Sequence, residues 1–127
     1  MLRGVAGALS VGCAAAALVG CAAVEQPEVE QVVAAFAAAD PAARCALLAP
    51  ATSAALERST STACAQAVAD VPTGGTVLHT AVWGDAAQVR TAEDTVFLTR
   101  TSGGWKIAAA GCTRTGDAPY GCEVDGP

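Results

Sequence analysis

Cysteine has the widest chemistry of any residue type in this 127-residue chain, and it occurs six times. A thiol can pair with a second thiol, ligate a metal ion or carry a covalently attached lipid. The six thiols belong to Cys13, Cys21, Cys45, Cys64, Cys112 and Cys122. Which chemistry each of them follows depends on the cellular compartment, and the N-terminal sequence carries the information about that compartment.

The uncharged run from Gly4 to Val24 is typical of an export signal. Arg3 is the only basic residue before it, and Glu25, the first acidic residue, follows it directly. A short basic region followed by an apolar stretch is the pattern of a secretory signal peptide. The sequence therefore predicts an exported protein whose folded part begins near residue 25.

The four residues Leu18, Val19, Gly20 and Cys21 resemble the lipobox of bacterial lipoproteins, in which a small residue precedes the modified cysteine. This resemblance implies that residues 1–20 are a signal peptide and that Cys21 becomes the mature N-terminus. Its sulfur would carry a diacylglycerol, and its new amine would be open to a further acyl chain such as palmitate. Each buried methylene contributes about 0.8 kcal/mol, so two or three chains would hold the protein on the outer face of the cell membrane.

Three other interpretations of this segment stay open. Residues 4–24 match the length of a membrane span, about 20 residues, although their Ala and Gly content makes a weak one. Ordinary signal cleavage after Ala23 would release the protein from the membrane. Cys21 could also be a buried structural cysteine.

Four cysteines remain after cleavage at either site: Cys45, Cys64, Cys112 and Cys122. An even number in a small exported domain predicts a disulfide framework, which here has three connectivities. We expect Cys45 to pair with Cys64, because both lie in helical segments that adjacent helices can present to each other. We expect Cys112 to pair with Cys122 and to close the turn-rich segment between them. Each bridge should stabilise the domain by about 3 kcal/mol.

A metal site and a nucleic-acid interface are both disfavoured, and no cofactor is expected. No CxxC pair is present, and His79 is the only histidine that could add an imidazole ligand. The exported part keeps all 12 acidic residues and, without Arg3, six of the seven basic ones, a formal charge of −6. Such a surface is the reverse of the clustered Lys and Arg that bind phosphate backbones.

The period of the apolar residues divides the exported part into helices and then strands. Val29, Val33 and Phe36 share the stripe of an amphipathic helix, and Asp40-Pro41 starts a second helix that runs to residue 48. One or two further helices are expected within 51–70. Alternating patterns then predict strands at 76–84, 86–91, 94–100 and 104–111.

This order predicts an α+β fold in which N-terminal helices pack on one face of a curved, four-stranded antiparallel sheet. Residues 21–27 would be a short tether, and residues 28–127 a single domain with a disulfide-closed C-terminal tail. Because aromatic residues make up only 4% of the chain, we expect a core of Ala, Val and Leu. Its aromatic members would be Phe36, Trp83, Phe97 and Trp105.

The hairpin sequence DTVFLTRTSGGWKIAAAGC at 94–112 resembles the terminal hairpin of the nuclear transport factor two-like, or ketosteroid isomerase-like, superfamily. Within that group the chain especially resembles the small cysteine-bearing lipoproteins of high-GC Gram-positive bacteria. The resemblance implies a cone-like, cystatin-like roll, in which the sheet wraps the helices around a pocket. Some members of the superfamily are enzymes, while many only bind or scaffold.

His79, Trp83 and Trp105 are the candidate pocket residues, with a structural His and two core tryptophans as the plainer interpretation. No residue is assigned a catalytic role, because no nucleophile, base and orienting group occur at a recognisable spacing. Glu93 and Asp94, the only adjacent acidic pair, fit an exposed turn between strands. The isomerase branch uses a tyrosine inside the cone, whereas Tyr120 lies in the tail.

The sequence therefore predicts a non-catalytic envelope lipoprotein of unknown activity. Its partners would be membrane lipid, bound through Cys21, and either a small apolar ligand or a membrane protein. The alternative is a small-pocket enzyme of the isomerase or hydrolase type that uses His79 or a carboxylate in the cone. The side chains that line the cavity discriminate between the two, because an enzyme needs a titratable group there.

Overall fold

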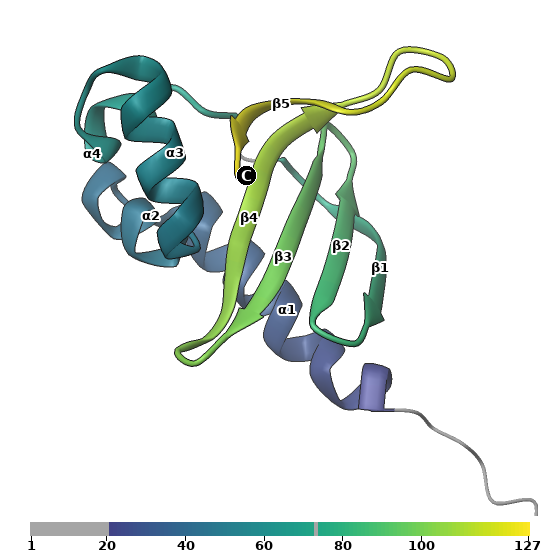
Figure 1. The fold of residues 1–127 in the computed structure, drawn as a ribbon. Helices are drawn as coiled ribbons and strands as arrows, with labels where there is room; N and C mark the ends of the chain where they lie inside the picture. Colours follow the sequence, from purple (N-terminus) through teal and green to yellow (C-terminus); the bar gives the residue numbers. More distant parts are fainter. Residues whose placement is uncertain (1–20, 73) are drawn as a thin grey trace, which may run out of the picture.

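The computed structural model describes residues 21–72 and 74–127, so the predicted signal peptide lies outside the described residues. Four helices precede five strands along the chain (Figure 1). The helices are α1 (Cys21–Ala38), α2 (Pro41–Leu47), α3 (Pro50–Thr60) and α4 (Cys64–Ala67). The strands are β1 (Val77–Trp83), β2 (Ala86–Thr91), β3 (Thr95–Thr101), β4 (Gly104–Thr113) and β5 (Gly121–Asp125). The α+β class predicted from the sequence is confirmed.

Helix α1 is the long helix that packs against the sheet. Its stripe of Val29, Val33 and Phe36 is buried, as the spacing predicts. Residues 21–27, expected as a tether, form its first turns, with Pro27 inside the helix. The first turns also contact the sheet, because Glu25 forms an ion pair with Arg100 of β3.

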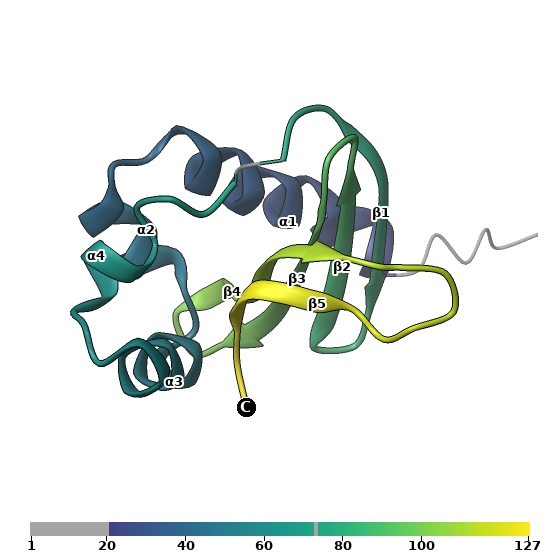
Figure 2. The ribbon, with the colours of Figure 1, turned by 90° about the horizontal axis from the view of Figure 1, so that it is seen from above.

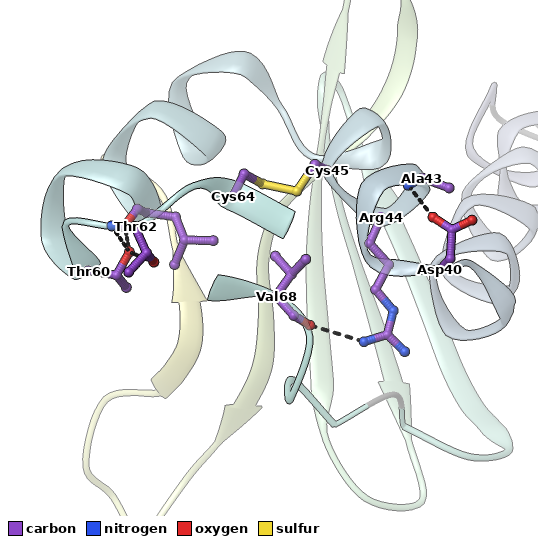
Figure 3. Close-up of a disulfide and its surroundings, with 9 residues drawn as sticks. Asp40, Ala43, Arg44, Cys45, Thr60, Thr62, Cys64 and Val68 are labelled. Carbon is purple, nitrogen blue, oxygen red and sulfur yellow. Dashed lines mark hydrogen bonds between the residues drawn. A yellow bond between two sulfur atoms is a disulfide. The ribbon is translucent and has the colours of Figure 1, made fainter. Parts of the chain in front are cut away.

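The short helices α2 and α4 are held together by the Cys45–Cys64 disulfide (Figure 3). Asp40 caps α2 by accepting a hydrogen bond of 2.9 Å from the Ala43 N–H, which satisfies one of the free donors of the helix N-terminus. The bridge crosses from the middle of α2 to the start of α4. It confirms the expected pairing.

The five strands form one open antiparallel sheet in the order β1-β2-β3-β4-β5. The predicted count of four was wrong, because the C-terminal tail contains β5. This strand pairs with β4, and Cys112 lies directly opposite Cys122, to which it is bonded. The second disulfide therefore joins two neighbouring strands, and the turn-rich segment between them is a hairpin loop. The expected pairing of these two cysteines is also confirmed.

Helix α1 covers one face of the sheet, while α2, α3 and α4 gather beside its β4–β5 side (Figure 2). The helical cluster is tied to β4 by backbone, since the Ala49 N–H donates a 2.8 Å hydrogen bond to the Ile107 carbonyl. The Thr52 hydroxyl adds a 3.0 Å bond to the Ala108 carbonyl. The face of the sheet that α1 covers is called the inner face below, and the opposite one the outer face.

The core lies between α1 and the inner face. Val89, Leu98 and Ile107 are buried there with the apolar stripe of α1. Two expected core aromatics lie elsewhere: Trp83 is 53% exposed, and Phe97 packs on the outer face against Tyr120. The expectation failed for them because alternation along a strand shows which residues share a face, but not which face a helix covers.

Candidate functional site

A small, partly open cavity lies between α1 and the inner face of the sheet. Its volume is about 90 Å³, and Val33 and Phe36 from α1 and Val96 and Ala110 from the sheet form part of its wall. The wall is mainly apolar, and Asp94 is the carboxylate among its described residues. A carboxylate facing a nonpolar cavity is chemically unusual because removing the charged form from water is costly.

The β2–β3 turn directs Asp94 inward. The Thr91 hydroxyl lies 2.6 Å from Asp94 Oδ1, to which it donates, and it accepts a hydrogen bond of 3.0 Å from the Asp94 N–H. The Thr91 N–H also donates to the Asp94 carbonyl across 2.9 Å. These bonds hold the carboxylate against the protein, and Asp94 is only 8% exposed.

The second carboxylate oxygen, Asp94 Oδ2, is buried and has no hydrogen-bond partner among the described residues. Gly74 lies close by, since a side chain on it would collide with Asp94 Oδ1 and with the Thr91 hydroxyl. This close approach requires glycine at position 74. The sequence interpretation of Asp94 as part of an exposed turn was therefore wrong. The Thr-x-x-Asp spacing, which permits the hydroxyl–carboxylate bond, was the available signal.

The three residues predicted to form a pocket do not come together. His79 is exposed on β1, and Trp83 ends the same strand. Their side chains lie on the outer face, because Thr80 and Val82, which alternate with them, contact α1 or the core. Trp105 is buried on the inner face of β4, and Arg100 of β3 lies opposite it in the sheet. None of the three lines the cavity beneath α1.

Trp105 is a core residue with a cation over its ring. The Arg100 guanidinium carbon lies 4.7 Å from the ring centroid, and the side chain is 4% exposed. Its indole Nε1 is buried without a partner among the described residues. The ring also forms part of an open groove with Val32 and Leu47. This packing supports the plainer interpretation of Trp105 as a core filler.

The β4–β5 hairpin loop folds back over the outer face through Tyr120. Its ring meets Phe97 edge-on, with centroids 5.1 Å apart, and the Arg114 guanidinium lies 5.4 Å from the Tyr120 centroid. An open hollow of about 640 Å³ lies beside it, and its wall includes Arg90 and Asp117. Because mixed charges line it and it is open to solvent, this hollow selects no ligand class.

The described residues contain few of the arrangements that support catalysis. Across residues 21–72 and 74–127, no three His, Cys, Asp or Glu side chains come together to hold a metal ion. His79 is exposed, and no hydrogen bond joins it to a carboxylate or hydroxyl of the described chain. No helix in the described part of the chain combines the length and apolar character of a membrane span.

Comparison with known proteins found no matching family model, no matching curated protein and no matching solved structure. The function has to be argued from the residues of this chain.

Proposed function

We propose that the protein is a lipid-anchored binding domain that takes a small, mainly apolar amine in the cavity beneath α1. The observation that carries this proposal is the placement of the Asp94 carboxylate in a mainly apolar wall. A buried carboxylate is stabilised by a donor or an opposite charge, and an ammonium group supplies both. The apolar wall would contact the carbon chain of the same molecule.

The size of the cavity limits the ligand. A volume of about 90 Å³ corresponds to about three water molecules at their share of liquid volume. A short alkylamine, or the aminoalkyl end of a larger molecule, fits this space. A cavity of this size is too small for a steroid-sized ligand, so the proposed ligand differs from that of the isomerase branch of the superfamily.

The proposal also includes a lipid anchor at Cys21 and membership of the nuclear transport factor two-like superfamily. The lipobox-like sequence before Cys21 and the even number of remaining cysteines support the export and anchoring of the domain. A long helix on one face of an antiparallel sheet, with further helices beside it, supports membership of the nuclear transport factor two-like group. The β-bulges in the β1–β2 and β3–β4 ladders would curve the sheet as a cone-like roll requires.

Thermal unfolding with propylamine tests the binding site. A ligand that binds only the folded state raises the melting temperature as its concentration rises. We expect this response in the unaltered protein and its loss in Asp94→Asn, which keeps the shape of the side chain and removes its charge. Asp70→Asn, at an exposed position, is the matched control and should keep the response. Propionate, an anion of similar size, should give none.

An equal response to propylamine in Asp94→Asn, or no response in the unaltered protein, would overturn the amine-binding proposal. Comparison with Asp70→Asn separates the loss of a specific carboxylate from a general change in protein charge.

The second candidate is a small-pocket enzyme in which Asp94 acts as a general base. The burial of Asp94 at the cavity favours it, because a base must reach a bound substrate in a water-poor site. The reaction in this case would be removal of a proton from the carbon next to a carbonyl group, a step for which a single carboxylate can serve as the base. Asp94-dependent deuterium exchange into a small ketone would support this candidate, and equal exchange in Asp94→Asn would exclude it.

A further inference from the structure

Four large apolar side chains are exposed in the described part of the chain: Val24, Val77, Leu78 and Trp83. Val24 lies in the first turns of α1, and the other three lie on β1. Trp83 is the largest of them and is 53% exposed. An exposed tryptophan is costly in water and is typical of a surface that meets a partner or a membrane.

Trp83 and Val24 lie at the same end of the molecule. Arg100 connects the two segments, because it pairs with Glu25, next to Val24, and lies 3.6 Å from Asp85 Oδ1 in the β1–β2 turn. The Arg100 N–H also donates a 2.8 Å hydrogen bond to the Asp85 carbonyl. Figure 1 shows the start of α1 beside this turn.

This end is also the one at which the lipid attachment is predicted. Cys21 precedes Val24 by three residues in α1, a rise of about 4.5 Å along the helix axis. Trp83 points from the outer face of the sheet, whereas Val24 belongs to a helix on the inner side. A partner with a broad, flat surface, such as a membrane, can contact both side chains at once when it lies across this end of the molecule. A partner that binds only one face of the sheet cannot.

We propose that this end, defined by Val24 and Trp83, rests in the headgroup region of the lipid bilayer, with Trp83 as an interfacial anchor beside the lipidated Cys21. The inference rests on the proposed lipid anchor. Tryptophan is favoured in this region because its ring is apolar while its N–H can still reach water. The contact would fix the orientation of the domain, with the strands directed away from the membrane.

The charges at this end decide how the contact should respond to salt. Glu25 and Asp85 both face Arg100, so the described residues form no basic cluster at this end that would attract anionic lipids. Insertion of Trp83 would therefore depend on apolar contact. We expect it to be equal at low and high salt.

Leu78 provides a matched control on the same strand. It is 60% exposed, but lies five residues from Trp83, about 16 Å along a strand. Each headgroup region is only about 5 to 8 Å deep. A domain that stands on its Trp83 end would therefore hold Leu78 in water, whereas a domain that lies on the β1 edge would bring both residues to the membrane.

The test uses the full lipidated protein in phosphatidylcholine vesicles with and without brominated acyl chains, which quench nearby tryptophan. Trp105 is 4% exposed and supplies a background that neither lipid nor soluble quenchers reach. We expect brominated lipid to quench the Trp83 emission and acrylamide to have little effect on it. Trp83→Phe should abolish the lipid quenching, and a Leu78→Trp reporter in that variant should respond to acrylamide alone.

The possible results separate the orientation from the anchor. Retention on vesicles without quenching of Trp83 by brominated lipid would overturn the inference and leave the anchor standing. Shielding of Trp83 from acrylamide without lipid quenching would mean that a protein covers it, and would also overturn the inference. Failure of the protein to remain on vesicles would overturn the anchor itself.

Discussion

The Thr91 hydroxyl and the Asp94 carboxylate face each other across 2.6 Å at the end of the β2–β3 ladder. The same hydroxyl accepts the Asp94 N–H, so one side chain holds both the backbone and the carboxylate of the turn. This pair places a charged group at an apolar cavity, and the proposed binding site depends on it.

Replacing Thr91 with Val should lower the free energy of unfolding by about 1 to 3 kcal/mol, because Asp94 would lose a buried hydrogen bond. It should also weaken the propylamine response, since the carboxylate would no longer be held in place. Thr99→Val, on the outer face of β3, is the control and should change stability little. Urea unfolding measures both variants. A Thr91→Val protein as stable as the unaltered one would show that the bond does not order the turn.

Removing the Cys45–Cys64 bridge should cost about 3 kcal/mol, because the bridge closes a loop between residues 19 apart in sequence. Cys45→Ala and the double variant Cys45→Ala/Cys64→Ala should be about equally destabilised, since each lacks the same bridge. Denaturant unfolding under non-reducing conditions measures this. A double variant much less stable than Cys45→Ala would contradict the prediction.

Arg44 should contribute more to stability than an ordinary surface arginine. Its guanidinium lies over the Phe36 ring and donates to the carbonyls of Phe36 and Val68, at 3.2 and 3.1 Å (Figure 3 shows the second bond). Arg44→Met keeps the apolar stem and should lower the free energy of unfolding by about 2 kcal/mol, because hydrogen bonds from a charged donor are lost. Arg58→Met, at an exposed position of α3, should change it by less than about 0.5 kcal/mol. Equal effects in the two variants would assign no special role to Arg44.

Cys21→Ala should leave the protein unprocessed or move it from the membrane fraction to the soluble fraction, because the acyl chains attach to this residue in our proposal. Intact mass spectrometry of the native protein measures the modification directly. A mass that begins at Cys21 and includes diacylglycerol is expected, with four thiols appearing only after reduction. A mass that begins after Ala23 without lipid would instead show ordinary secretion.

Local features of the sequence determined the elements and the crosslinks. The stripe of Val29, Val33 and Phe36 specified a helix with one buried face, because the 3.6-residue period of the helix places them together. The even number of cysteines after residue 21 predicted two bridges with three possible connectivities, and the structure contains the pairs favoured by the chain path, Cys45–Cys64 and Cys112–Cys122. These predictions succeeded because each depended on residues that are close in sequence or on the number of thiols alone.

Long-range packing decided the rest. Only the tertiary structure shows that Asp94 is buried, because its burial depends on α1 and Gly74, which are far from it in sequence. It also decides that Trp83 is exposed while Trp105 is buried, since none of the described helices covers the outer face at β1. The pairing of β5 with β4 is likewise a tertiary feature: it places Cys122 opposite Cys112 and Val124 opposite Ala110. Periodicity identifies the face that a side chain shares with its neighbours, whereas the arrangement of distant elements determines whether that face is covered.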